Sequence, residues 1–163
     1  MIGYRPGLIA DIVGLHADYY ARDWGFGLPF EAKVASELSA FMRDFRPGLD
    51  FFAAEDDDNG ALLGTISLEA PTSTELLAHL RWFITSDGAR GTGLGRRLMD
   101  KAMAHVDAKG FPGVYLTTFV GLGPARHLYE SFGFNLVAEE ERDQWSGGVR
   151  EQRFERHRTD AKA

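Results

Sequence analysis

Two stretches near the start of the chain have apolar residues at helical spacing. The first opens after Pro6-Gly7 and repeats apolar or aromatic positions along one helix face: Ile9, Ile12, Val13, His16 and Tyr20. The second places Pro29 in its first turn, and its apolar stripe runs through Phe30, Val34, Leu38, Phe41 and Phe45. Pro47-Gly48 then ends this pattern. We therefore predict two consecutive helices.

A strand-like pattern replaces the helical one after residue 49. Residues 50–55 and 61–70 form short apolar runs, and the acidic turn between them contains Asn59-Gly60, a hairpin signal in a loop longer than two residues. The third run, residues 76–85, alternates less cleanly and predicts a strand buried on both faces. Residues 2–5 predict an additional short strand before the first helix.

The second half of the chain alternates strands and helices. A helix is predicted from Leu94, Leu98, Ala102 and Val106 at four-residue spacing, and Gly110 ends it. Strand 113–119, helix 124–132 and closing strands 134–140 and 150–157 follow. Hairpin signals imply antiparallel pairing early in the chain, and strand–helix–strand units imply parallel pairing later. The predicted fold is α/β (α+β), with a mixed sheet and helices on both faces.

Composition narrows the class of protein. The 163 residues suit one domain, predicted over residues 1–158 with a frayed tail at 159–163. The net charge of -6 and the lack of a helix-turn-helix segment disfavour nucleic acid. The absence of cysteine excludes disulfides, thiolate metal ligands and cysteine nucleophiles. Without an apolar run of membrane-spanning length, we expect a cytoplasmic protein with no membrane partner.

The stretch "ARGTGLGRR", residues 89–97, has three glycines at alternate positions between a strand and a helix. A dinucleotide fingerprint fails because Arg96 stands where its third glycine would be, and a triphosphate P-loop fails because Gly95 precedes two arginines. The pattern Arg/Gln-x-x-Gly-x-Gly/Ala is satisfied by Arg90, Gly93 and Gly95.

A pyrophosphate suits this loop on physical grounds. The first N–H groups of a helix lack intrahelical partners, and the helix dipole adds partial positive charge there. Glycines remove the Cβ atoms that would keep an anion away, and the arginines add cationic side chains. The alternative is a connection that only lets strand and helix pack closely.

Two segments resemble a known family. Residues 80–97, "LRWFITSDGARGTGLGRR", resemble motif A of the GCN5-related N-acetyltransferases (GNAT superfamily), and residues 125–134, "ARHLYESFGF", resemble a later family motif. The order of elements is similar to the family's. The resemblance implies a mostly antiparallel central sheet of about six to seven strands. The opening "GYRPG" resembles acetyltransferase domains fused to MarR-type regulators, here expected without the DNA-binding domain.

The resemblance also implies where acetyl-CoA, the acyl donor, binds. Backbone groups of Phe83, Ile84 and Thr85 are expected to pair with the pantetheine arm like an added strand. The pyrophosphate is expected on the following loop, formed by Arg90, Gly91, Thr92, Gly93, Leu94, Gly95 and Arg96. No metal is expected, because no histidine–carboxylate spacing suggests a metal site.

The catalytic groups are assigned on the same basis. Tyr129 occupies the family's position for the tyrosine beside the CoA sulfur, where a phenol can protonate the departing thiolate. Leu122 replaces an asparagine common in the family, which removes one polar contact to the donor. His79 is the candidate base that accepts the amine proton, with Glu75 as its competitor.

Acceptor-binding residues are expected around the first helix and before the last strand. The family resemblance implies a pocket at an aromatic cluster, with core packing as the alternative: His16, Tyr19, Tyr20, Trp24 and Phe26. The segment with Asp143, Gln144 and Trp145 can also reach the acceptor in related enzymes.

The leading hypothesis is an acetyl-CoA-dependent N-acetyltransferase in which an amine attacks the thioester directly. The acceptor is a small-molecule or peptide amine. A homodimer is one possible state, since dimers are common in the family, but the sequence does not fix the oligomeric state. The alternative is a non-catalytic acyl-CoA-binding sensor. Tyr129 favours the enzyme.

Overall fold

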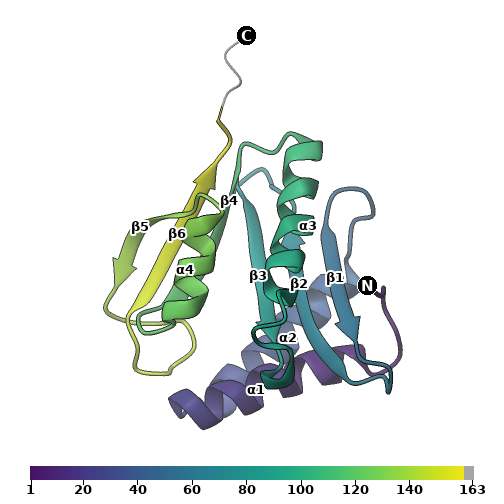
Figure 1. Ribbon diagram of the computed structural model, residues 1–163. Helices are drawn as coiled ribbons and strands as arrows, with labels where there is room; N and C mark the ends of the chain where they lie inside the picture. Colours follow the sequence, from purple (N-terminus) through teal and green to yellow (C-terminus); the bar gives the residue numbers. More distant parts are fainter. Residues whose placement is uncertain (160–163) are drawn as a thin grey trace.

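A six-stranded mixed sheet forms the centre of the protein in a computed structural model that describes residues 1–159 (Figure 1). The strands are β1 (Phe51–Asp56), β2 (Leu62–Glu69), β3 (Ala78–Thr85), β4 (Gly113–Phe119), β5 (Asn135–Glu140) and β6 (Glu151–His157). They lie in the order β1-β2-β3-β4-β6-β5. Only β3 and β4 pair in parallel, because β6 inserts between β4 and β5 and runs antiparallel to both.

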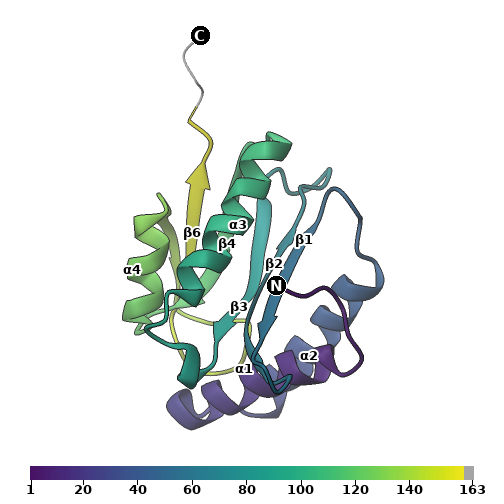
Figure 2. The same cartoon turned by 45° about the vertical axis from the view of Figure 1, so that its right-hand side comes forward.

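Helices cover both faces of this sheet, as predicted (Figure 2). They are α1 (Leu8–Trp24), α2 (Leu28–Arg43), α3 (Leu94–Lys109) and α4 (Gly123–Ser131), with a short 3-10 helix at Asp87–Ala89. One apolar core lies between the sheet and α3 and α4, and a second lies beneath α1 and α2. The predicted fold class is confirmed.

The expected strand over residues 2–5 is wrong. Ile2 makes one isolated bridge to Ala54, and Tyr4 is exposed. With little apolar surface to bury, this segment gains nothing from extending the ladder before the left-handed turn at Gly7 (φ 86°) starts α1. The tail expected at residues 159–163 lies outside the described residues beyond Thr159.

A bulge in β3 explains why its sequence alternates poorly. Trp82 has a left-handed backbone (φ 47°), and Trp82 and Phe83 together oppose the single residue Ile66 of β2. The extra residue changes the face to which later side chains point. Leu80 and Phe83 contact the core under α3, whereas Trp82 joins the core under α1 and α2. Side chains of β3 therefore pack into apolar cores on both faces of the sheet, as predicted, while buried and half-buried residues alternate along the strand.

The parallel contact between β3 and β4 is very short. It consists of Ala78 opposite Val114 and His79 opposite Tyr115, after which the two strands diverge. Strand β4 continues along β6 through to Phe119. From Leu80 onward, β3 therefore has no strand partner on its β4 side among the described residues.

No helix in the described part of the chain is both long and apolar enough to cross a bilayer.

The start of β4 tolerates no side chain at Gly113. A Cβ there would lie 2.5 Å from the backbone oxygen of Arg156 in β6, and backbone cannot move aside cheaply. We expect Gly113→Ala to lower the free energy of unfolding by roughly 1–3 kcal/mol, measured by urea denaturation. Gly123→Ala is the control, since a Cβ at Gly123 meets nothing within 4 Å. Equal stability of the two variants would contradict the close packing of β4 on β6.

Candidate functional site

A cavity of about 110 Å³ opens where β3 and β4 diverge. We call it the inner cavity. Both diverging strands line it, with helices α1 and α2 above them, Tyr129 of α4 and the segment before β6. Its walls are His16, Tyr20, Phe30, Lys33, Val34, Glu37, His79 to Phe83, Leu116 to Phe119, Tyr129, Gln144 and Trp145.

The glycine loop lies at the start of α3, directly after β3. Gly91 and Gly93 adopt left-handed backbone (φ 78° and 80°). Within residues 1–159, five N–H groups of this loop donate to no acceptor: those of Gly91, Gly93, Leu94, Gly95 and Arg96. A Cβ at Gly95 would lie 3.4 Å from the Phe83 ring, so the close packing of α3 on β3 fixes the loop beside the end of that strand.

Ionic and cation–π contacts connect the glycine loop to α1. The Arg90 guanidinium lies 4.6 Å from the ring centre of Tyr19 and 3.1 Å from Asp87. Arg22 of α1 also pairs with Asp87, at 2.8 Å. Arg96 donates to the Ser131 hydroxyl at 3.3 Å. The predicted arginines thus surround the loop, and their side chains are exposed.

Tyr129 extends from α4 to the inner cavity and is only 7% exposed. Burial raises its pKa, so the phenol keeps its proton at neutral pH. Its hydroxyl has no hydrogen-bond partner within residues 1–159. Leu122, where the family often has asparagine, precedes α4 and makes no side-chain cap.

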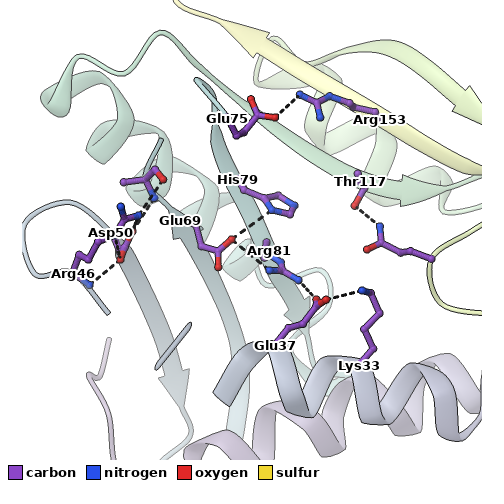
Figure 3. A network of polar contacts seen from close by, with 12 residues as sticks. Lys33, Glu37, Arg46, Asp50, Glu69, Glu75, His79, Arg81, Thr117 and Arg153 are labelled. Atoms are coloured by element: carbon purple, nitrogen blue, oxygen red, sulfur yellow. Dashed lines mark hydrogen bonds and ion pairs between the residues drawn. The ribbon is translucent and has the colours of Figure 1, made fainter. Parts of the chain in front are cut away.

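His79 belongs to a chain of charged side chains across the wall of the inner cavity (Figure 3). Lys33 and Arg81 both pair with Glu37, and Arg81 also lies 3.4 Å from Glu69. The same Glu69 oxygen, Oε2, is 3.6 Å from Nδ1 of His79. The imidazole stacks on Tyr115 with ring centres 4.2 Å apart.

The protonation states in this chain follow from burial and pairing. Burial lowers the pKa of His79, which Glu69 only partly offsets, so the imidazole is neutral near pH 7. Burial by itself would raise the pKa of Glu69, but His79 and Arg81 together hold it below its usual value. The site therefore pairs a neutral imidazole with an ionised carboxylate.

Glu75 lies in a second cavity of about 410 Å³, which we call the outer groove. The groove shares Glu37, His79 and Arg81 with the inner cavity. Glu75 accepts the N–H of Leu77 at 3.1 Å and lies 3.6 Å from Arg153. The structure thus places His79 at both cavities and Glu75 at the outer groove alone.

The predicted acceptor-binding aromatics divide into two groups. Tyr20 and Trp145 line the inner cavity. Trp24 and Phe26 do not line it, and their rings pack against Phe119 at 4.8 and 5.3 Å.

The segment carrying Trp145 is ordered by Asp143. Its carboxylate accepts backbone N–H groups of Trp145, Gly147 and Val149 at 2.8 to 3.1 Å. Burial would raise the pKa of Asp143, but these N–H donors outweigh it and hold the pKa low. The ionised carboxylate therefore fixes this wall of the inner cavity.

His16 is 5% exposed and faces the inner cavity from α1. Its Nδ1 lies 2.8 Å from the carbonyl oxygen of Ile12. Burial lowers its pKa to about 4, and the bond to Ile12 opposes this only in part. The ring is therefore neutral at physiological pH.

Sequence reasoning missed three charged members of the site. Glu69 stands opposite His79 in the β2–β3 register, and counting along that hairpin could have found it. Arg81 follows His79 on the same side of β3, where strand alternation could have indicated it. Glu37 lies on α2, and no local sequence pattern predicts its contact with Arg81.

Within the described part of the chain, no group of three or more His, Asp or Glu side chains is arranged to hold a metal ion.

The buried His16 makes stability depend on pH. Its pKa falls from an ordinary 6.5 to about 4 on folding, so its stabilising contribution is complete above pH 6.5 and is lost as the pH falls toward 4. Between pH 8 and pH 5, we expect the free energy of unfolding of the unmodified protein to fall by about 2 kcal/mol more than that of His16→Gln. Urea unfolding at both pH values measures this difference. Equal losses of stability in the two proteins would show that folding does not lower the pKa of His16.

Comparison with known proteins identifies the family and the fold. Residues 11–134 match the family model described as the acetyltransferase (GNAT) family. An uncharacterized N-acetyltransferase of Schizosaccharomyces pombe is 28% identical over 118 residues, covering 72% of this chain and 71% of that protein.

Solved structures agree on the fold. One chain of the NatC complex bound to Gag peptide and CoA superposes with a TM-score of 0.74 at 17% identity, covering 95% of this chain and 93% of that one. A streptothricin acetyltransferase described as putative, from Bacillus anthracis in complex with acetyl coenzyme A, gives 0.58 at 18% identity, covering 71% and 65%. The protein is an acetyltransferase, and its chain belongs to the GNAT family.

Proposed function

We propose that the protein transfers the acetyl group of acetyl-CoA to an amine by direct attack on the thioester. The observation that carries this proposal is the divergence of β3 from β4, which opens the inner cavity beside Tyr129. The acetyl group meets the amine in that cavity.

The donor fits the surface that leads to the inner cavity. The free edge of β3 after His79 can pair with the pantetheine amides as a strand would, at Phe83, Ile84 and Thr85. The five unpaired N–H groups of the glycine loop suit the pyrophosphate, which needs several donors close to the backbone. The NatC chain and the streptothricin enzyme are bound to CoA and acetyl coenzyme A, respectively, which supports the same ligand here.

Tyr129 is the proposed acid. As the nitrogen lone pair attacks the carbonyl carbon, the carbon–sulfur bond breaks and the CoA thiolate takes the phenolic proton. Burial keeps this phenol protonated until the thiolate forms, and its hydroxyl has no protein partner to compete.

His79 is the proposed base and Glu75 the second candidate. The neutral imidazole can accept the proton that leaves the attacking amine, and Glu69 beside it stabilises the imidazolium that results. Because His79 borders both cavities, it can pass that proton from the inner cavity toward the outer groove.

The outer groove is the proposed entry for the acceptor, a small-molecule or peptide amine. Carboxylates outnumber basic side chains along it: Glu37, Asp44, Asp50, Glu69 and Glu75, against Arg46 and Arg81. This balance suits a cationic amine. Tyr20 and Trp145 would contact it in the inner cavity. The alternative of a non-catalytic sensor finds no support among relatives named for acetyl transfer.

The proposal is tested by acetyl-CoA binding and turnover together. Acetyl-CoA should raise the melting temperature, as any ligand selective for the native state does. Adding a panel of amines should then release CoA thiol. Since the protein has no cysteine, a thiol reagent reports CoA alone. The proposal would be rejected if acetyl-CoA did not shift the melting temperature and no amine released thiol.

Removing the Tyr129 hydroxyl should slow turnover without weakening donor binding. We expect Tyr129→Phe to lower kcat by roughly 100-fold or more, within the usual range for a general acid. The rise in melting temperature with acetyl-CoA should be unchanged. Tyr4→Phe is the control, because Tyr4 is 66% exposed. An unaltered kcat would exclude Tyr129 as the acid.

The two candidate bases can be separated by their pH–rate profiles. A base must be deprotonated to act, so kcat/KM should rise with pH through the pKa of His79, below 6.5. We expect His79→Gln to abolish this rise and to lower kcat/KM at pH 7 by about 100-fold. Glu75→Gln should leave the rise of kcat/KM with pH, and its value at pH 7, nearly unchanged. The reverse result would assign the base to Glu75.

A further inference from the structure

The imidazole of His16 is fixed in one tautomer. A carbonyl oxygen can only accept a hydrogen bond, so the 2.8 Å contact with Ile12 requires the proton on Nδ1. The other ring nitrogen, Nε2, then carries a lone pair and can only accept. No donor within residues 1–159 reaches it.

The position of Nε2 follows from burial. His16 is 5% exposed, and the cavity it borders is the inner one. Among the described residues, Ser67 Oγ is the one fully enclosed side-chain polar atom that lacks a partner. Nε2 is therefore not fully enclosed, and the inner cavity is the one that His16 lines. Nε2 has a free lone pair there, so it can accept a hydrogen bond from a ligand N–H or O–H.

From this geometry we propose that His16 is an acceptor-binding residue, whose Nε2 receives a hydrogen bond from the N–H of the attacking amine. The inference rests on the proposed function and adds to it the group that orients the nucleophile. A neutral primary amine has two N–H bonds and one lone pair. Holding one N–H on Nε2 directs the lone pair toward the thioester carbon.

The surroundings of His16 narrow the kind of acceptor. Tyr20, one helical turn further, stacks on the imidazole with ring centres 6.4 Å apart, and its hydroxyl also lacks a protein partner among the described residues. Two apolar walls lie against Tyr20, the rings of Phe30 and Phe119, with centres 5.0 and 5.8 Å from that of Tyr20. The pocket thus fits a primary amine on an apolar carbon segment.

His16 and His79 have separate tasks. His79 borders the outer groove and has Glu69 beside it, so an imidazolium there is stabilised and its proton can leave. Among residues 1–159, His16 has no carboxylate partner, and it does not line the outer groove. It binds an N–H and does not carry the proton away.

Nitrogen NMR of the whole protein tests the assignment. The protein is labelled with ¹⁵N-histidine, saturated with coenzyme A and titrated with n-propylamine. The His16 signal is the one lost in His16→Asn, which keeps a donor near the Nδ1 position but lacks a group at Nε2. We expect Nε2 to have the ¹⁵N chemical shift of an unprotonated imidazole nitrogen, and we expect this signal to move upfield as the amine binds. A protonated Nε2, or a resonance that the amine leaves unmoved, would overturn the proposal.

Kinetics provide the second readout. With the amine that the thiol-release assay turns over fastest, His16→Asn should raise the KM for the amine by about tenfold, the loss of one hydrogen bond. The KM for acetyl-CoA should not change. His16→Gln, whose amide oxygen can reach the Nε2 position, should recover most of the loss. Equal changes in both KM values, or no recovery with glutamine, would indicate a structural role alone.

The two proposals fail in different ways. Loss of CoA binding and of thiol release in the unmodified protein would contradict the proposed function. Normal binding and turnover with an unmoved His16 resonance would contradict only the role of His16.

Discussion

The separation of β3 from β4 determines where everything else in this protein can act. Two residue pairs hold the strands together, and the bulge at Trp82 then turns the following side chains to the opposite faces. A sheet that stayed paired to its end would fill the inner cavity with ladder hydrogen bonds. Because this one does not, backbone donors and acceptors at the centre of the fold are available to a ligand. Burial of the two apolar cores compensates for the ladder hydrogen bonds that β3 and β4 do not make.

The walls of the inner cavity come from elements on both faces of the sheet. Helix α4 supplies Tyr129 from one side, and helices α1 and α2 supply His16, Tyr20 and Glu37 from the other. The strands between them contribute His79 and Arg81. The proposed acid, base and binding groups are therefore held by separate helices and strands, whose packing fixes their relative positions more firmly than a loop could. Neutral imidazoles and a protonated phenol follow from the same burial.

Local chemistry was predictable from the sequence, and non-local contacts were not. The glycines at 91, 93 and 95 indicated a phosphate loop because their conformational freedom and spacing are local properties. The strand and helix order followed from periodicity in the same way. The bulge at Trp82 appeared only as irregular alternation, because its cause is the partner register on β2. The pairing of Glu37 with Arg81 joins residues 44 positions apart, and the core position of Phe26 depends on Phe119; neither leaves a pattern in the sequence.

Helix α1 contacts both the glycine loop and the inner cavity, which we propose bind the donor and the acceptor, respectively. Its buried side presents His16 and Tyr20 to the inner cavity, while Tyr19 and Arg22 grip Arg90 and Asp87 beside the glycine loop. A displacement of that loop by the pyrophosphate would be transmitted mechanically through the helix to the amine pocket. Thermodynamic linkage makes such a transmission reciprocal, so whatever one substrate gains in affinity from the presence of the other, the second gains equally from the first. Helix α1 is thus the element shared by the proposed donor and acceptor sites, and linkage through it would act equally whichever substrate binds first.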